Sequence, residues 1–286
     1  MKKKSVILPW LFIIPALVAY GLFKYFPILQ AAFLSLRSSS ALGTGNFVGF
    51  ANYLRAFSDE LFRRAWFNTF YFVVLNLLIN FIPPIVLAIC ISEVRKGQSF
   101  FRTAFFIPSL TPAIVTMVLW KWIYNPDYGL LNYLLGLFKL PKQLWLNDPK
   151  LAMLCLVLPG LWGAGYNAVI YLAALTGIPQ ELYEAAAIDG ATVWQRITKI
   201  TIPRLRPVIV TMFILAVMGS FQVFNQPFVM TGGGPMNATN VVSLQIYNQA
   251  FEFMEFNYAV AQAMILFAVL FVLTWLQLRF VKADVD

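Results

Sequence analysis

The sequence predicts an all-α, polytopic membrane protein with six transmembrane helices. Hydrophobic residues make up 60% of the 286 residues and charged residues only 12%, about half the charged share of a soluble domain, which is roughly 25%. The mean hydropathy is +0.73. Six apolar stretches reach the length of about 20 residues that a helix needs to cross a bilayer.

We expect one transmembrane domain over residues 1–286, with spans at 9–34, 68–91, 103–123, 151–175, 208–228 and 258–280. The first span follows Lys2, Lys3 and Lys4 and therefore resembles a secretory signal peptide, for which residues 16–19 (Ala-Leu-Val-Ala) offer a cleavage site. Its apolar run continues well past residue 19, too far for a signal peptide. We therefore predict an uncleaved first helix.

The second and third spans contain prolines, at Pro83, Pro84, Pro108 and Pro112. Proline frees backbone carbonyls that neighbouring groups must satisfy. Such breaks suit a moving pore and also occur in static bundles. The two cysteines, Cys90 and Cys155, lie in apolar spans near opposite membrane faces, so we expect no disulfide and interpret both as small core residues.

Basic residues predict the orientation, because cytoplasmic segments carry more Lys and Arg. With the amino terminus inside, the inner segments hold 12 basic residues and the outer segments 7. Both termini are then cytoplasmic. Lys24 and Lys121 fall near the outer ends of their spans, where they either extend to the surface or contact a substrate or ion.

Two outer segments, 37–67 and 125–150, are too short for independent domains but contain apolar and aromatic residues. We expect short surface helices there. They either anchor the protein at the membrane interface or contact an extracytoplasmic partner.

The sequence lacks the residues of common catalytic sites. It has no His, no Walker A pattern, no nucleophile elbow and no Cys/His metal cluster. The acidic residues lie outside the apolar spans. We therefore expect no catalytic residue, metal, cofactor or nucleic acid partner. Energy for uphill transport has to come from another subunit.

A polar, helix-prone insert separates the fourth and fifth spans, within a loop at about 178–206. Glu184, Ala185 and Ala186 favour a helix, Gly190 allows a bend, and Pro203 ends the pattern before the next span. We predict a short helix, a turn and a second short helix at the membrane surface, where another protein docks.

These residues resemble the EAA motif of bacterial ABC importer permeases. The motif has Glu-Ala-Ala, then Gly, then Ile-x-Leu-Pro, and the match is complete except that Ile202 replaces Leu. Two further segments, 228–251 with its Thr-Gly-Gly-Gly-Pro run and 47–53, resemble the sugar and glycerol-phosphate branch of this family. The resemblance covers nearly the whole chain.

The resemblance implies an inner-membrane permease subunit with four kinds of partner: a second homologous permease, two ABC ATPase subunits, an extracytoplasmic solute-binding protein and the sugar cargo. The loop then acts as the coupling helix that docks into the ATPase. The implied coupling residues are Glu184, Ala185, Ala186, Asp189, Gly190, Ala191, Ile200 and Pro203. The implied binding-protein contacts are Gly232, Gly233, Gly234 and Pro235.

Two helical faces are candidates for the substrate path. Pro159, Trp162, Gly163 and Tyr166 share one face of the fourth span, and Ala216, Gly219, Ser220 and Val223 share one of the fifth. In maltose-type members the spans flanking the EAA loop hold the substrate, but Pro159 and Ser220 stand where that pattern has Asn. Plain helix packing is the alternative. The candidate path residues are Trp162, Gly163, Tyr166, Ser220, Val223 and Asn225.

We favour import of a di- or oligosaccharide. Glycerol phosphate and a monosaccharide remain alternatives within the same machinery. A secondary transporter is a further alternative, disfavoured by the coupling loop and the lack of charges within the spans. A membrane-embedded enzyme has no credible catalytic residues here.

Overall fold

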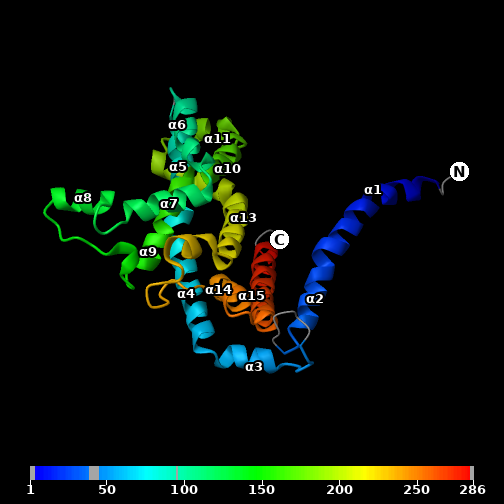
Figure 1. Ribbon diagram of the computed structural model, residues 1–286. Helices are drawn as coiled ribbons and strands as arrows, with labels where there is room; N and C mark the ends of the chain where they lie inside the picture. Colours follow the sequence, from blue (N-terminus) through cyan, green and yellow to red (C-terminus); the bar gives the residue numbers. More distant parts are fainter. Residues whose placement is uncertain (1–3, 39–44, 95, 284–286) are drawn as a thin grey trace. The chain divides into compact units, whose positions relative to one another are not determined.

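The computed structural model describes residues 4–38, 45–94 and 96–283, whose regular elements are helices (Figure 1). Five helices are long and apolar enough to cross a membrane, and a bent pair makes up to six. The predicted all-α polytopic class is confirmed. The helices are α1 (Lys4–Tyr20), α2 (Phe26–Leu34), α3 (Ala51–Ser58), α4 (Glu60–Asn76), α5 (Ile82–Glu93), α6 (Gln98–Phe106), α7 (Ala113–Ile123), α8 (Leu130–Leu137), α9 (Ala152–Val157), α10 (Ala164–Thr176), α11 (Gln180–Ile188), α12 (Val193–Arg196), α13 (Ile202–Phe221), α14 (Val242–Tyr247) and α15 (Phe256–Ala283).

By its contacts the chain divides into two compact units, 1–63 with 245–271, and 64–244 with 272–286. In the first unit, a π-helical turn at Gly21–Tyr25 joins α1 and α2 into one continuous helix. None of the most apolar window within Phe12–Leu34 is buried. The rest of the first unit therefore leaves this surface uncovered.

The amino-terminal helix of this unit is tied to α3 by Asn52. This buried side chain donates to the carbonyls of Ser35 at 2.8 Å and Arg37 at 2.6 Å. Arg55 of α3 pairs with Glu255 at 2.6 Å, just before α15. Polar contacts thus join the two sequence segments of the unit.

In the second unit α10 contacts α5, α6 and α13 (Figure 1). Gly165 admits α6 closely, because a Cβ there would collide with the Phe105 carbonyl. A core cluster fills the space between α5, α10 and α13 and consists of Ala88, Ile91, Ala168, Tyr171, Leu172, Leu175 and Leu205.

The third predicted span, 103–123, is not one straight helix. Its two halves, Gln98–Leu110 and Ala113–Ile123, are bent by 89°. Pro112 stands at the break as the N-cap of α7, with extended backbone (ψ 134°), and it has no N–H with which to continue the hydrogen bonds of the preceding helix.

The fifth span differs from its prediction at both ends. One helix runs over Val193–Phe221 and ends before residue 228. The prediction that Pro203 stops a helix before the span is wrong. Pro203 is the second residue of α13 and directly follows a π-helical turn at Ile197–Thr201, so the helix continues through the proline with a local change in its hydrogen bonding.

The cysteine interpretation is only half right. Cys155 is buried, whereas Cys90 is exposed.

Candidate functional site: a helical loop and a polar cavity

The loop between the fourth and fifth spans contains a helix with a well-defined end. At the carboxyl end of α11, Ala191 N–H donates to Ala186 O at 2.9 Å and Gly190 N–H to Ala187 O at 3.1 Å. Gly190 has φ +74°. This pair of bonds with a left-handed glycine is the Schellman arrangement, which fixes the direction of the chain after α11.

The second helix of the loop begins with a capping box. Gln195 N–H donates to Thr192 Oγ1 at 3.3 Å, and Thr192 N–H donates to Gln195 Oε1 at 2.8 Å. The Tyr183 hydroxyl of α11 lies 3.0 Å from the hydroxyl of buried Thr201, in the π-helical turn that follows α12. The loop is therefore a rigid helix pair, continuous with the fifth span.

The predicted coupling residues lie on α11, in the turn after it and at the start of the fifth-span helix after α12, and most of them are exposed. Glu184 is exposed and accepts a hydrogen bond from Gln180 Nε2 at 3.0 Å. The sequence reasoning missed two apolar side chains at the tip, Ile188 (87% exposed) and Trp194 (72%). Their apolar surface next to a sharp bend is the signal that could have identified them. Of the predicted set, Glu184, Ala185, Asp189, Gly190 and Pro203 are exposed, and Ala186, Ala191 and Ile200 are half-buried.

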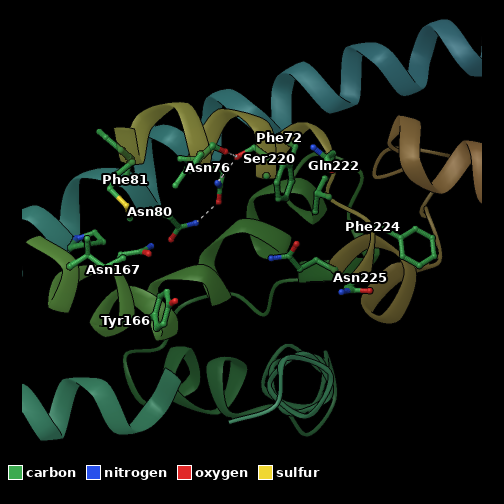
Figure 2. Close-up of a pocket in the computed structure, with 18 of the residues that line it drawn as sticks. Phe72, Asn76, Asn80, Phe81, Tyr166, Asn167, Ser220, Gln222, Phe224 and Asn225 are labelled. Carbon is green, nitrogen blue, oxygen red and sulfur yellow. Dashed lines mark hydrogen bonds between the residues drawn. The ribbon is translucent and has the colours of Figure 1, made fainter. Parts of the chain in front are cut away.

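A cavity of about 640 Å³ opens inside the second unit, lined by α4, α5, α7, α10 and α13 and the segment that follows α13 (Figure 2). The polar side chains that line it are mostly carboxamides, with some hydroxyls. Aromatic rings also line it. The carboxamides are Asn76, Asn80, Asn167, Gln222, Asn225 and Gln226.

A chain of hydrogen bonds crosses the wall of this cavity and connects three spans. Asn80 Nδ2 donates to the Val157 carbonyl at 3.0 Å and to Asn76 Oδ1 at 2.8 Å. Asn76 Nδ2 donates to Ser220 Oγ at 2.8 Å, and that hydroxyl donates to Ala216 O at 2.6 Å. Figure 2 shows the links between Asn80, Asn76 and Ser220.

Asn80 can reach the fourth span because that span is interrupted. A 3-10 segment, Leu158–Gly163, follows α9, and Asn80 bonds the carbonyl just before it. Gly160 gives it room, since a Cβ there would lie 2.5 Å from Asn80 Nδ2.

A smaller cavity of about 290 Å³ adjoins the first, and Met117, Tyr166 and Gln226 line both. Trp162 and Gly163 line the smaller cavity, while Ser220, Val223 and Asn225 line the larger. Each of the six predicted path residues thus lines one or both of these two adjoining cavities. The sequence reasoning missed Asn167, Phe72 and Phe81, which no short motif distinguishes from helix packing.

The Thr-Gly-Gly-Gly-Pro segment forms a tightly bonded loop. Thr239 Oγ1 donates to Gly234 O at 2.6 Å and lies 2.7 Å from Thr231 Oγ1. Asn68 of α4, another residue not predicted, donates to the carbonyls of Asn237 and Asn240 at 2.8 and 2.9 Å.

The four predicted binding-protein contacts differ in exposure. Gly232 is exposed, Gly234 and Pro235 are half-buried, and Gly233 is buried. Met236, 77% exposed, protrudes most among the large side chains of this loop. Lys121 lines a separate cavity beside the loop and not the carboxamide cavity.

Apolar helices that line a polar cavity, together with a rigid exposed helix pair in one loop, define a membrane transport subunit. Residues 84–283 match the model of a family described as "Binding-protein-dependent transport system inner membrane component". The chain belongs to this family and is a multi-pass protein of the inner membrane.

Known proteins agree with this assignment along the whole chain. The probable ABC transporter permease protein YurN of Bacillus subtilis is 37% identical over 99% of this chain and 98% of its own length. The lactose transport system permease protein LacF of Rhizobium radiobacter is 34% identical over 94% and 92%. A crystal structure of a bacterial ABC transporter involved in the import of the acidic polysaccharide alginate contains a similar chain, with a TM-score of 0.88 and 26% identity over 99% of this chain and 98% of that one.

Proposed function

We propose that this chain is the permease subunit of an ABC importer for a neutral sugar of more than one ring. A solute-binding protein delivers the sugar to one face. A second permease completes the pore, and two ATPase subunits on the opposite, cytoplasmic face supply the energy. ATP hydrolysis resides in those partner subunits.

The carboxamide lining of the large cavity carries this proposal. A carboxamide has both hydrogen-bond donors and acceptors, and a sugar hydroxyl both donates and accepts. Each carboxamide can therefore form paired hydrogen bonds with a sugar, and no charged group is needed. Three aromatic side chains that are not buried supply apolar faces for the sugar ring: Phe81, Tyr166 and Phe224. Figure 2 shows labelled rings and carboxamides interspersed around the space.

The same lining is poorly suited to an anion such as glycerol phosphate. Phosphate sites in proteins usually provide an Arg or Lys, because charge-assisted bonds offset the loss of hydration. Lys121 lies in the other cavity, and Lys24 lies 5.6 Å from the Tyr20 ring in the first unit. The second cavity adjoins the first and adds volume beside it, which favours a di- or oligosaccharide over a monosaccharide.

Uptake competition tests the cargo. The importer, reconstituted with its binding protein, is supplied with labelled disaccharide and with excess glucose, maltotriose or glycerol 3-phosphate. We expect ATP-dependent disaccharide uptake that a neutral oligosaccharide inhibits and glycerol 3-phosphate does not. Inhibition by glycerol 3-phosphate alone would contradict the neutral-sugar assignment. Uptake that continues without the ATPase subunits would favour a secondary transporter.

A substitution at the exposed tip of the loop tests the proposed ATPase contact. Trp194→Asp places a charge on a surface that we propose is buried against the ATPase, and we expect this variant to lose most of the copurifying ATPase subunit. Phe138→Asp is the matched control, because Phe138 is equally exposed (76%) and follows α8, far from the loop in sequence. Equal ATPase recovery with both variants would exclude the tip as a contact.

A further inference from the structure

A second polar cavity, of about 470 Å³, lies behind the coupling loop. The loop elements α11, α12 and the π-helical turn form one side of it, and α5, α6 and α10 the other. This volume falls within the range of small-molecule sites, about 300–1,000 Å³. The lining residues are Ile89, Ser92, Glu93, Gln98, Leu172, Leu175, Thr176, Ile178, Gln180, Tyr183, Arg196 and Thr201.

The guanidinium of Arg196 in this cavity is incompletely satisfied. Its Nε is buried and has no hydrogen-bond partner among the described residues. Leaving a charged donor unpaired in a buried position is costly. An anionic acceptor in the cavity would remove that cost, and guanidinium binds phosphate and carboxylate through paired N–H groups.

The charges around the cavity also favour an anion. An adjoining cavity of about 280 Å³ shares Gln98, Leu172 and Thr176 with it and is lined by Arg102. The acidic residue Glu93 is exposed, so water screens its charge more than that of half-buried Arg196. The combined lining thus has two arginines, one glutamate and several neutral donors.

We propose that this cavity binds a phosphate-bearing anion, held by Arg196 and by the Tyr183 hydroxyl, whose oxygen accepts from the neighbouring Thr201 hydroxyl and so keeps its own proton for the anion. The source is either a free phosphate compound or the headgroup of an anionic lipid. The ligand contacts the loop and the helix bundle at once. It also adjoins Gln180, which donates to Glu184 of the coupling motif. Bound anion therefore restrains the coupling loop against the bundle.

Hydrogen–deuterium exchange of residues 180–201 measures this restraint in the assembled importer. The complex is placed in phosphatidylcholine nanodiscs with inorganic phosphate, against chloride at equal ionic strength, and separately in nanodiscs containing phosphatidylglycerol. We expect one of the two anions to slow exchange in the loop by about fivefold or more, the lower end of usual coupling energies. The readout requires no cargo, so its failure leaves the proposed function standing.

Substitutions test whether the slowed exchange depends on the residues that line this cavity. Arg196→Gln removes the charge and should abolish the protection, whereas Lys199→Gln removes an exposed charge from the same loop that does not line the cavity and should keep it. Tyr183→Phe, which keeps the ring, should weaken it and serves if Arg196→Gln fails to assemble. Protection by phosphate identifies a soluble ligand, and protection only by phosphatidylglycerol identifies a lipid. No protection by either, or equal protection in wild type and Arg196→Gln, overturns the proposal.

Discussion

Asn80 is the residue at which cavity lining and helix packing meet. Its Nδ2 bonds both the interrupted fourth span and Asn76, while its Oδ1 is buried without a partner among the described residues. A buried acceptor in that state costs about 1–3 kcal/mol. The Asn80 side chain thus links two helices of the cavity wall, and its unpaired oxygen lowers the stability of the folded protein.

Gly160→Ala should destabilise the protein by about 1–3 kcal/mol, the usual cost of overpacking. The new Cβ would lie 2.5–2.9 Å from three atoms of the Asn80 carboxamide and force it off the Val157 carbonyl. Thermal unfolding in detergent measures the change. Gly163→Ala is the control, because its Cβ meets nothing within 4 Å; equal loss of stability in both variants would show that Asn80 is not the cause.

Tyr166→Ala should raise the KM for uptake about threefold to tenfold. Tyr166 borders both cavities, and an aromatic contact contributes about 0.5–1.5 kcal/mol. Uptake at varied concentrations of loaded binding protein gives KM and the maximum rate separately. Tyr133→Ala is the control, since this exposed tyrosine of α8 lines neither of these two cavities. An unchanged KM for Tyr166→Ala would remove it from the path.

At the scale of elements, the loop that we propose couples to the ATPase combines two terminal motifs that restrict its backbone. A left-handed glycine ends α11 and a capping box begins α12. A rigid connection transmits rigid-body motion, which a flexible one would absorb. The continuity of α12 with α13 extends this connection into the fifth span, which lines the large cavity.

Gly190→Val should lower cargo-stimulated ATPase activity and leave sugar capture by the binding protein unchanged. A left-handed conformation costs an ordinary residue about 1–2 kcal/mol, and a β-branched one more, so the turn at φ +74° would shift. Glu184→Lys should act in the same direction by altering the exposed face of α11.

The control for local strain is Gly49→Val, because Gly49 also has a positive φ, +58°, but lies before α3. We expect it to keep the stimulation. ATP turnover with and without loaded binding protein makes the comparison. Wild-type stimulation in Gly190→Val would contradict the coupling assignment.

At the scale of the whole molecule, the placement of the loop and of the Thr-Gly-Gly-Gly-Pro segment on opposite membrane faces is a prediction from basic residues. Single cysteines replace Gly190 and Met236 in a chain without Cys90 and Cys155. An impermeant thiol reagent applied from outside should label residue 236, and residue 190 only after the membrane is opened. Labelling of residue 190 in intact cells would contradict both the orientation and the ATPase contact.

Sequence reasoning succeeded where the signal is local. The apolar runs, the loop at Glu184 and the bend at Gly190 depend on neighbouring residues, whose properties are read directly. It failed at Pro203, because the helix of the fifth span continues through this proline by way of the π-helical turn before it. It also failed at Cys90, whose exposure depends on which face of α5 packs against α10.

The sequence by itself determined that this chain is a membrane-spanning helical bundle with a polar helical loop between its fourth and fifth spans, since composition and short spacings decide both. Only the tertiary structure decided which polar residues share a space. Asn76 and Ser220 are 144 positions apart and meet because α4 and α13 pack together around the interrupted fourth span. The cavity behind Arg196 arises in the same way, from helices whose contact no local pattern encodes.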